Sequence, residues 1–134
     1  INSIISGGNG ITSPEISLYG NGFPIADGNR RTNRGNNTDF GNALRFGSRR
    51  TKSFDLFNNG VGSALTVRRI RVRGTPFRVK RKLRSVQAGR TASFSIEFRG
   101  MGQRRARGRV RVFSNDPVNP VYQFALVGRS RARN

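Results

Sequence analysis

The sequence predicts an all-β fold, a β-sandwich of seven to eight short antiparallel strands. Apolar residues alternate with polar ones in several short stretches, which is the period of a strand with one buried face. Turn sequences rich in Gly, Asn and Pro separate these stretches at regular spacing, and no stretch has a convincing helical period. Ten phenylalanines and no tryptophan suit an interior filled with rings that need no hydrogen-bond partner. A chain of 134 residues fits a single domain.

The first strand is expected at residues 15–19, where Ile16 and Leu18 alternate with polar positions before the turn Gly20-Asn21-Gly22. Residues 27–37 contain no large apolar side chain, so an exposed loop is expected there. The alternation and the turns predict further strands at residues 40–46, 51–57, 64–73, 77–83, 91–98, 108–113 and 121–127.

The period of two also predicts the core. Leu65 and Val67 are out of phase with Ile70 and Val72, so a β-bulge is expected at Arg68-Arg69. The core positions expected from this phase are Ile16, Leu18, Phe54, Leu56, Leu65, Val67, Ile70, Val72, Phe94, Ile96, Phe98, Val110, Val112, Tyr122, Phe124 and Leu126.

The chain is strongly basic, with 26 Lys and Arg against six Asp and Glu and a formal charge of +20. Residues 66–134 hold 19 of these basic residues and only two acids. All but three of the 26 are arginine, whose planar guanidinium binds phosphate, sulfate or carboxylate through two parallel hydrogen bonds. This composition favours recognition of an acidic partner, although arginines on solvated strand faces are the plainer alternative.

The two ends of the chain differ from its middle. Residues 1–13 are small, polar and glycine-rich with interspersed isoleucines, so we expect a linker or a strand that pairs with a sheet edge. The sandwich is expected over residues 14–128, followed by a basic tail at residues 129–134.

The order and spacing of several short motifs resemble a known family, the bacterial choice-of-anchor D module, which is similar to the ASH and hydin immunoglobulin-like domains. The matching positions are Pro14-Glu15-Ile16, Leu18, Gly20-Asn21-Gly22, Ile25, Thr38-Asp39-Phe40-Gly41, Gly47-Ser48, Phe54, Phe57-Asn58-Asn59-Gly60, Ala64-Leu65, Phe94, Ile96, Phe98, Ser114-Asn115-Asp116-Pro117, Pro120, Tyr122, Phe124 and Gly128. The resemblance implies an immunoglobulin-like sandwich in a secreted or surface-attached bacterial protein, with no catalytic residues. Unlike the family, this chain carries arginine on the outer strand faces.

An arginine-rich face follows from this topology. In a constant-type immunoglobulin sandwich the third and sixth strands are neighbours, and here these are residues 64–73 and 108–113. With the aliphatic residues of both strands in the core, their arginines share one outer face, which we expect the next strand and a nearby loop to extend. The candidate polyanion-binding residues are Arg69, Arg71, Arg73, Arg78, Lys80, Lys82, Arg104, Arg105, Arg107, Arg109 and Arg111.

The sequence offers little for catalysis. It contains no His and no Cys, so neither a His-dependent triad nor a thiolate zinc site can be assembled. Of the six carboxylates, Asp39 and Asp116 lie in turn sequences where a side chain accepts backbone N–H bonds. We therefore expect no enzyme activity, no metal and no cofactor.

The expected function is that of a structural or adhesive module at the bacterial cell surface or outside the cell. Its partner would be an acidic polysaccharide, an anionic envelope or an acidic protein surface. The first alternative is a module that binds nucleic acid through its phosphates without sequence specificity. The second is a self-assembling spacer or repeat of a longer chain, paired through its N-terminal segment. No apolar run approaches the ~20 residues of a membrane span.

Overall fold

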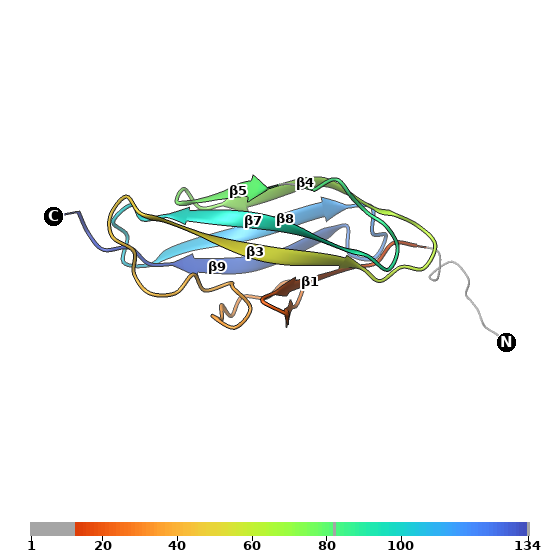
Figure 1. Ribbon diagram of the computed structural model, residues 1–134, viewed down its shortest axis with the longest axis horizontal. Coiled ribbons are helices and arrows are strands. Elements are labelled where there is room, and N and C mark those ends of the chain that lie inside the picture. The colour runs from red at the N-terminus through yellow and green to blue at the C-terminus, as the bar shows by residue number, and fades with distance from the viewer. Residues whose placement is uncertain (1–12, 82, 134) are drawn as a thin grey trace.

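The computed structural model describes residues 13–81 and 83–133. These residues form nine β-strands and no helix, in two antiparallel sheets packed face to face (Figure 1). The strands are β1 (Ile16–Gly20), β2 (Phe23–Ile25), β3 (Arg49–Asn58), β4 (Leu65–Arg73), β5 (Phe77–Arg81), β6 (Ser85–Val86), β7 (Thr91–Arg99), β8 (Ala106–Ser114) and β9 (Val121–Gly128). The predicted all-β sandwich is confirmed.

The two sheets have the strand orders β2-β1-β3-β7-β5 and β6-β4-β8-β9. β3 and β7 form the centre of the first sheet, and β8 lies between β4 and β9 in the second. The predicted pairing of residues 64–73 with residues 108–113 is therefore correct. The pairing of β4 with β8 shifts register between Val67 and Arg69, which confirms the predicted bulge.

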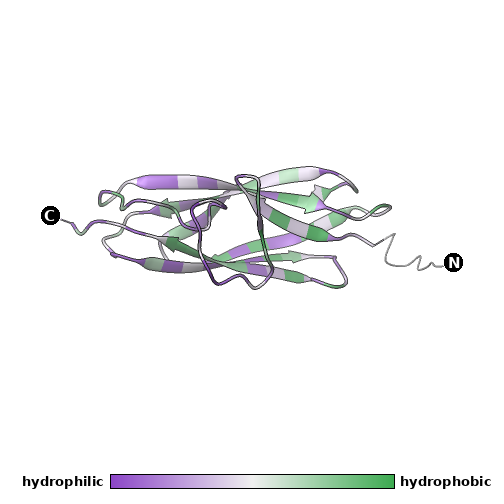
Figure 2. Ribbon diagram, turned by 90° about the horizontal axis from the view of Figure 1, so that it is seen from below, coloured by the Kyte–Doolittle hydropathy of each residue, from purple (hydrophilic) through white to green (hydrophobic). Residues whose placement is uncertain are grey.

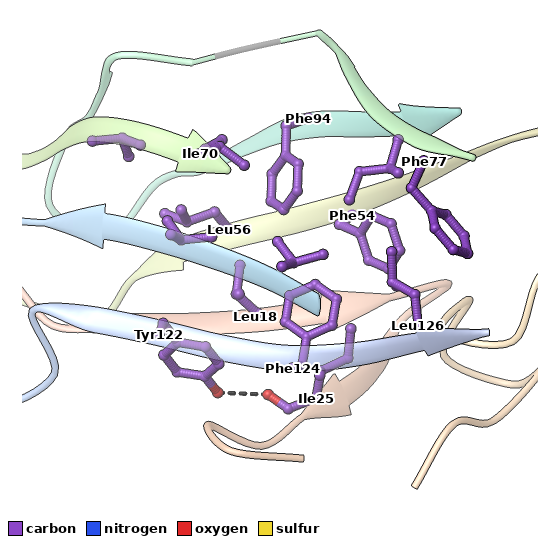
Figure 3. Packing of buried hydrophobic residues seen from close by; sticks show 14 of the residues in the cluster. Leu18, Ile25, Phe54, Leu56, Ile70, Phe77, Phe94, Tyr122, Phe124 and Leu126 are labelled. Carbon is purple, nitrogen blue, oxygen red and sulfur yellow. Dashed lines mark hydrogen bonds between the residues drawn. The ribbon is translucent and has the colours of Figure 1, made fainter. Parts of the chain in front are cut away.

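The core fills the space between the sheets, and hydrophobic residues alternate with hydrophilic ones along the strands (Figure 2). All the predicted core residues are buried except Val72, which is half-buried. Phe54 stacks on Phe94 with ring centroids 5.6 Å apart and also contacts Phe124 of the facing sheet at 5.4 Å (Figure 3). A second ring cluster joins Phe77 to Phe98 at 5.0 Å. The contact of Phe54 with Phe124 joins the two sheets and helps to fix how they are stacked, whereas the other two contacts lie within the first sheet.

The predicted strands differ from the observed ones in four places. Residues 40–46 form no strand, although Phe40 and Leu44 are buried. The short strands β2 and β6 were missed, because Pro24 interrupts the strand pattern of β2 and β6 has only two residues. The predicted strand at residues 77–83 ends at Arg81 as β5.

The expected exposed loop is part of a longer irregular segment, residues 27–44, which we call the arm. It runs along the free edge of β9 and touches it through isolated parallel bridges, Asn29 to Phe124 and Asp39 to Val127. Residues 40–46 form no strand because their backbone makes isolated hydrogen bonds rather than a continuous ladder. One of these is the 2.8 Å hydrogen bond from the Phe40 N–H to the Val127 carbonyl. The arm thereby covers an edge that would otherwise expose unpaired backbone groups.

Buried polar side chains hold the turns. Asp116 accepts hydrogen bonds from the backbone N–H groups of Val118 and Asn119 in its own turn, and from Ile16 at the start of β1. Asn58 is fully buried, and its side-chain nitrogen donates to the carbonyls of Ser63 and Val86. The turn role predicted for Asp116 is confirmed, and its side chain additionally ties two distant segments together.

Of the two predicted end segments, residues 1–12 lie outside the described residues. Residues 129–131, which belong to the expected basic tail, pair with the arm. The Leu44 N–H donates to the Arg129 carbonyl at 2.9 Å, and the Arg131 N–H donates to the Leu44 carbonyl at 2.7 Å. The chain after β9 is thus fixed to the sandwich as far as Arg131.

Candidate anion-binding face

Six arginines form two rows on the outer face of the second sheet. Ile70 and Val112, which are paired across β4 and β8, point into the core, so the residues that alternate with them point outward. Arg71 lies opposite Arg111, and Arg73 lies opposite Arg109. We call this set the arginine stripe, and its members are Arg69, Arg71, Arg73, Arg107, Arg109 and Arg111.

The stripe has few partners of its own. The Arg69 guanidinium lies 5.6 Å from the ring centroid of Phe113, its neighbour across the strand pair. Arg109 donates a 3.3 Å hydrogen bond to the side-chain oxygen of Gln123 on β9. Within residues 13–81 and 83–133, no carboxylate lies within 4.0 Å of a stripe guanidinium. Like charges therefore face each other across two strands without a carboxylate of the described residues to neutralise them, which destabilises the unliganded sheet.

One end of the stripe opens into a hollow of about 510 Å³. Arg73, at the end of β4, and Arg107 and Arg109, near the start of β8, line one side of it. Arg105, in the loop before β8, and Arg30 and Thr32 of the arm complete the wall. Ala125 faces outward opposite Arg109 and forms part of the floor of the hollow, where its short side chain leaves space.

The arm brings Arg30 to the hollow through backbone hydrogen bonds to β9. The Gly28 N–H donates to the Gln123 carbonyl at 2.7 Å, and the Ala125 N–H donates to the Asn29 carbonyl at 2.9 Å. The Asp27 carboxylate accepts a 2.9 Å hydrogen bond from the Gln123 N–H. Arg30 therefore directly follows a residue that is fixed to the sheet edge.

Farther along the arm, a buried network fixes its shape. The Thr38 hydroxyl is fully buried, lies 2.6 Å from the side-chain oxygen of Asn36 and accepts a 2.8 Å bond from the Asn33 N–H. The Asp39 carboxylate accepts a 2.7 Å ion-pair hydrogen bond from Arg129 and a bond from the Gly41 N–H. Burial opposes ionisation of Asp39, but these bonds outweigh it and hold the pKa of Asp39 below its ordinary value.

The predicted extension of the stripe by β5 was wrong. β5 belongs to the other sheet, because the chain crosses between sheets after β4, so Arg78 and Lys80 lie on the opposite outer face. There they flank Glu97 of β7, with nitrogen-to-oxygen distances of 3.4 and 3.7 Å. Lys82 lies outside the described residues. Arg104 is exposed in the loop before β8 and is not among the residues that line the hollow.

Arg30 is the site residue that the sequence prediction missed. It lies in a stretch with no large apolar residue and no strand period, which carries no signal of what it packs against. Only the long-range bridge of Asn29 to Phe124 places it beside the arginines of β8. The described part of the chain contains no helix of the length and hydrophobicity that a membrane crossing requires.

No protein-family model matches the sequence, and no curated protein matches it in sequence. Solved structures do match in fold. A protein of unknown function from Porphyromonas gingivalis W83 superposes with a TM-score of 0.64 at 11% identity, over 92% of this chain and 50% of that one. The ASH or PapD-like domain 7 of human CEP192 gives a TM-score of 0.61 at 11% identity, over 100% of this chain and 97% of that one.

A third match is weaker. The secreted serine protease VesC from Vibrio cholerae gives a TM-score of 0.53 at 12% identity, over 69% of this chain but only 21% of the protease. This chain thus corresponds to half of the Porphyromonas protein, a fifth of the protease and nearly all of the CEP192 domain. At this level of identity the matches show the fold alone, which is an immunoglobulin-like sandwich of the ASH or PapD type.

Proposed function

We propose that this chain is a non-enzymatic immunoglobulin-like module of a secreted or cell-surface protein and that it belongs to the choice-of-anchor D type. In this proposal, the module binds an acidic polymer or an acidic protein surface through the arginine stripe. The main support is the cross-strand register, which sets Arg71 against Arg111 and Arg73 against Arg109 without a carboxylate in reach among the described residues. A bound polyanion would neutralise these charges, and relief of their repulsion would favour binding.

The contrast with the opposite face supports this assignment. There, Arg78 and Lys80 are neutralised in part by Glu97, which is buried beneath them. On the stripe, Arg109 and Arg111 are half-buried among other arginines, so their charges are less well screened by water than those of exposed side chains. Arginine also binds oxyanions through a fixed pair of donors, which lysine lacks.

Nucleic acid remains the first alternative ligand, and the stripe limits how it would be bound. The ring of Phe113 beside the stripe is covered by the Arg69 guanidinium, so it is not free to stack on a base. Nucleic acid on this face would therefore be contacted through its phosphates, and its affinity would fall steeply with salt.

The test compares two matched double variants. Arg71→Gln with Arg111→Gln removes a cross-strand pair from the stripe. Arg49→Gln with Arg99→Gln removes the same charge from a cross-strand pair on the outer face of the other sheet. Binding to duplex DNA, RNA, a polyuronate and a sulfated polysaccharide is measured by titration at several salt concentrations.

We expect the stripe variant to lose tenfold or more in affinity for one polymer, because two charge-assisted contacts are worth about 1.5 to 3 kcal/mol each. The control variant should lose much less. Equal losses in both variants would mean that binding follows net charge alone, and the stripe would not be the site. If no polymer binds, the spacer alternative is favoured, and its test is whether deletion of residues 1–13 abolishes self-association.

A further inference from the structure

The hollow at the end of the stripe differs from the stripe itself in shape and in chemistry. The stripe is an open strand surface, whereas the hollow is walled on one side by the arm. Five arginines line it, and they come from four segments of the chain, which are the arm, the end of β4, the loop before β8 and β8 itself. They are Arg30, Arg73, Arg105, Arg107 and Arg109.

The rest of the lining narrows the ligand class. It consists of Thr32, two glycines and the aliphatic residues Ala125, Leu126 and Val127, with no aromatic residue and no carboxylate. Without a ring, the hollow has nothing on which a base or a sugar face would stack. Without a carboxylate, it has no group that would bind a metal ion or neutralise the guanidiniums from within. The lining is therefore suited to a ligand that is mainly negative charge.

The arrangement of hydrogen-bond donors around a site distinguishes planar from tetrahedral oxyanions. A carboxylate is planar and has two oxygens, so it is best matched by donors in one plane. A phosphate or sulfate group is tetrahedral and presents three oxygens, which donors arranged around it on different sides can all reach. The arginines that line the hollow belong to the arm on one side and to β4, β8 and the loop before β8 on the other.

We propose that this hollow is a specific site for a tetrahedral oxyanion, a phosphate or sulfate group. The inference rests on the proposed function in so far as the same group would belong to the acidic polymer that lies along the stripe. At about 510 Å³ the hollow falls within the 300 to 1,000 Å³ typical of small-ligand sites, so it has room for two linked groups.

The experiment is isothermal titration of the folded chain with inorganic pyrophosphate, and with citrate as a planar-carboxylate anion of similar charge, at physiological ionic strength. A tetrahedral-oxyanion site should bind pyrophosphate at least about tenfold more tightly than citrate, the equivalent of 1.4 kcal/mol. A second titration compares inorganic phosphate with inorganic sulfate at mildly alkaline pH, where both are dianions. Binding of either one supports the site, and the tighter of the two identifies the ester carried by the natural ligand.

Two variants test whether the hollow itself is responsible. Arg30→Gln removes a guanidinium that is not part of the stripe, and Ala125→Leu fills the floor without any change of charge. Both should weaken pyrophosphate binding about tenfold or more. The control is Arg71→Gln, which removes the same charge from the stripe at a position outside the hollow, and should change pyrophosphate affinity less than threefold.

Three results would overturn the proposal. These are citrate binding as tight as that of pyrophosphate, unchanged pyrophosphate affinity in both Arg30→Gln and Ala125→Leu, or an equal loss in Arg71→Gln. The outcome is separable from that of the proposed function, because polymer binding is tested by the stripe variants at Arg71 and Arg111. If polymer binding depends on the stripe but pyrophosphate ignores Arg30 and Ala125, only the hollow is wrong. If pyrophosphate depends on them but no polymer depends on the stripe, only the proposed function is wrong.

Discussion

Arg71 of β4 and Arg111 of β8 face each other directly across an antiparallel strand pair, on the solvent side of the sheet. Residues in this relationship have their Cβ atoms about 4.5 to 5.5 Å apart, close enough for the two positive charges to interact. Arg73 and Arg109 repeat the arrangement two residues further along. The unliganded sheet therefore carries a local electrostatic strain that salt or a bound anion would relieve.

The first prediction follows from this pair. Arg111→Glu converts a repulsive cross-strand contact with Arg71 into an attractive one, so the free energy of unfolding at low salt should rise by about 0.2 to 1 kcal/mol. Urea unfolding at low and high salt measures the free energy of unfolding, and the increase over wild type should shrink as salt is added. The same variant should bind acidic polymers more weakly. A variant that is less stable than wild type at low salt would contradict this account of the stripe.

The second prediction concerns Asp116, whose side chain joins the turn before β9 to β1. Asp116→Ala leaves the backbone N–H groups of Ile16, Val118 and Asn119 without their acceptor. We expect a loss of about 3 kcal/mol in the free energy of unfolding, since each buried unpaired group costs about 1 to 3 kcal/mol and some will find water. Asp116→Asn keeps one acceptor oxygen and should lose less. Equal losses in the two variants would mean that the negative charge, rather than the hydrogen bonds, is what matters.

The third prediction concerns alkaline pH. Burial, followed by the nearby Asp27 charge, raises the pKa of Tyr122, whose hydroxyl donates a 2.5 Å hydrogen bond to the Ile25 carbonyl (Figure 3). A group whose pKa is raised in the folded state stabilises the fold below its unfolded pKa. That stability is lost as pH rises through the folded value, so the loss should begin above about pH 10.

Tyr122→Phe provides the measurement. It should cost about 1 kcal/mol at neutral pH through the lost hydrogen bond. Its free energy of unfolding should then fall less than that of wild type when pH is raised above about 10. The two proteins differ at this residue alone, so the contributions of all other groups cancel in the difference. Parallel declines in the two proteins would show that Tyr122 ionises as easily in the folded chain as in the unfolded one.

The fourth prediction concerns acid pH and the attachment of the arm. The pKa of Asp39 is lowered because its bonds to Arg129 and Gly41 outweigh the effect of burial. Its contribution to stability is present above the unfolded pKa and is lost as pH falls through the lowered folded value, which lies below about pH 4. The difference in unfolding free energy between wild type and Asp39→Asn should therefore be largest near neutral pH and disappear in acid. A difference that is the same at both pH values would contradict this role.

Some of this structure could be predicted from the sequence because the information is local. In residues 69–73 of β4 and 109–112 of β8 aliphatic residues alternate with arginines, so the period of two alone indicates which side chains are buried and which face solvent. The bulge between Val67 and Arg69 is visible as a change of phase. The turn role of Asp116 follows from its position before a proline and beside Asn115.

Other features depend on contacts between segments far apart in the chain. Whether β5 extends the stripe depends on which sheet the chain enters after Gly74, and alternation is the same in either sheet. The arm has no period of its own, since its backbone is satisfied by β9 and by the chain after it at isolated points such as Leu44. The apolar side chain of Phe40 made residues 40–46 resemble a strand, whereas it is buried in a ring cluster with Phe77 and Phe98.

The sequence by itself determined the long strands, most of the core and the presence of an arginine row on one face of each of two strands, because side-chain alternation is a property of the extended backbone. Only the tertiary structure decided the register in which these rows face each other, that Arg78 and Lys80 face away from them, and that Arg30 lines a hollow beside them. The physical reason is that sheet membership and the path of the arm are set by packing and backbone pairing between residues that are distant along the chain.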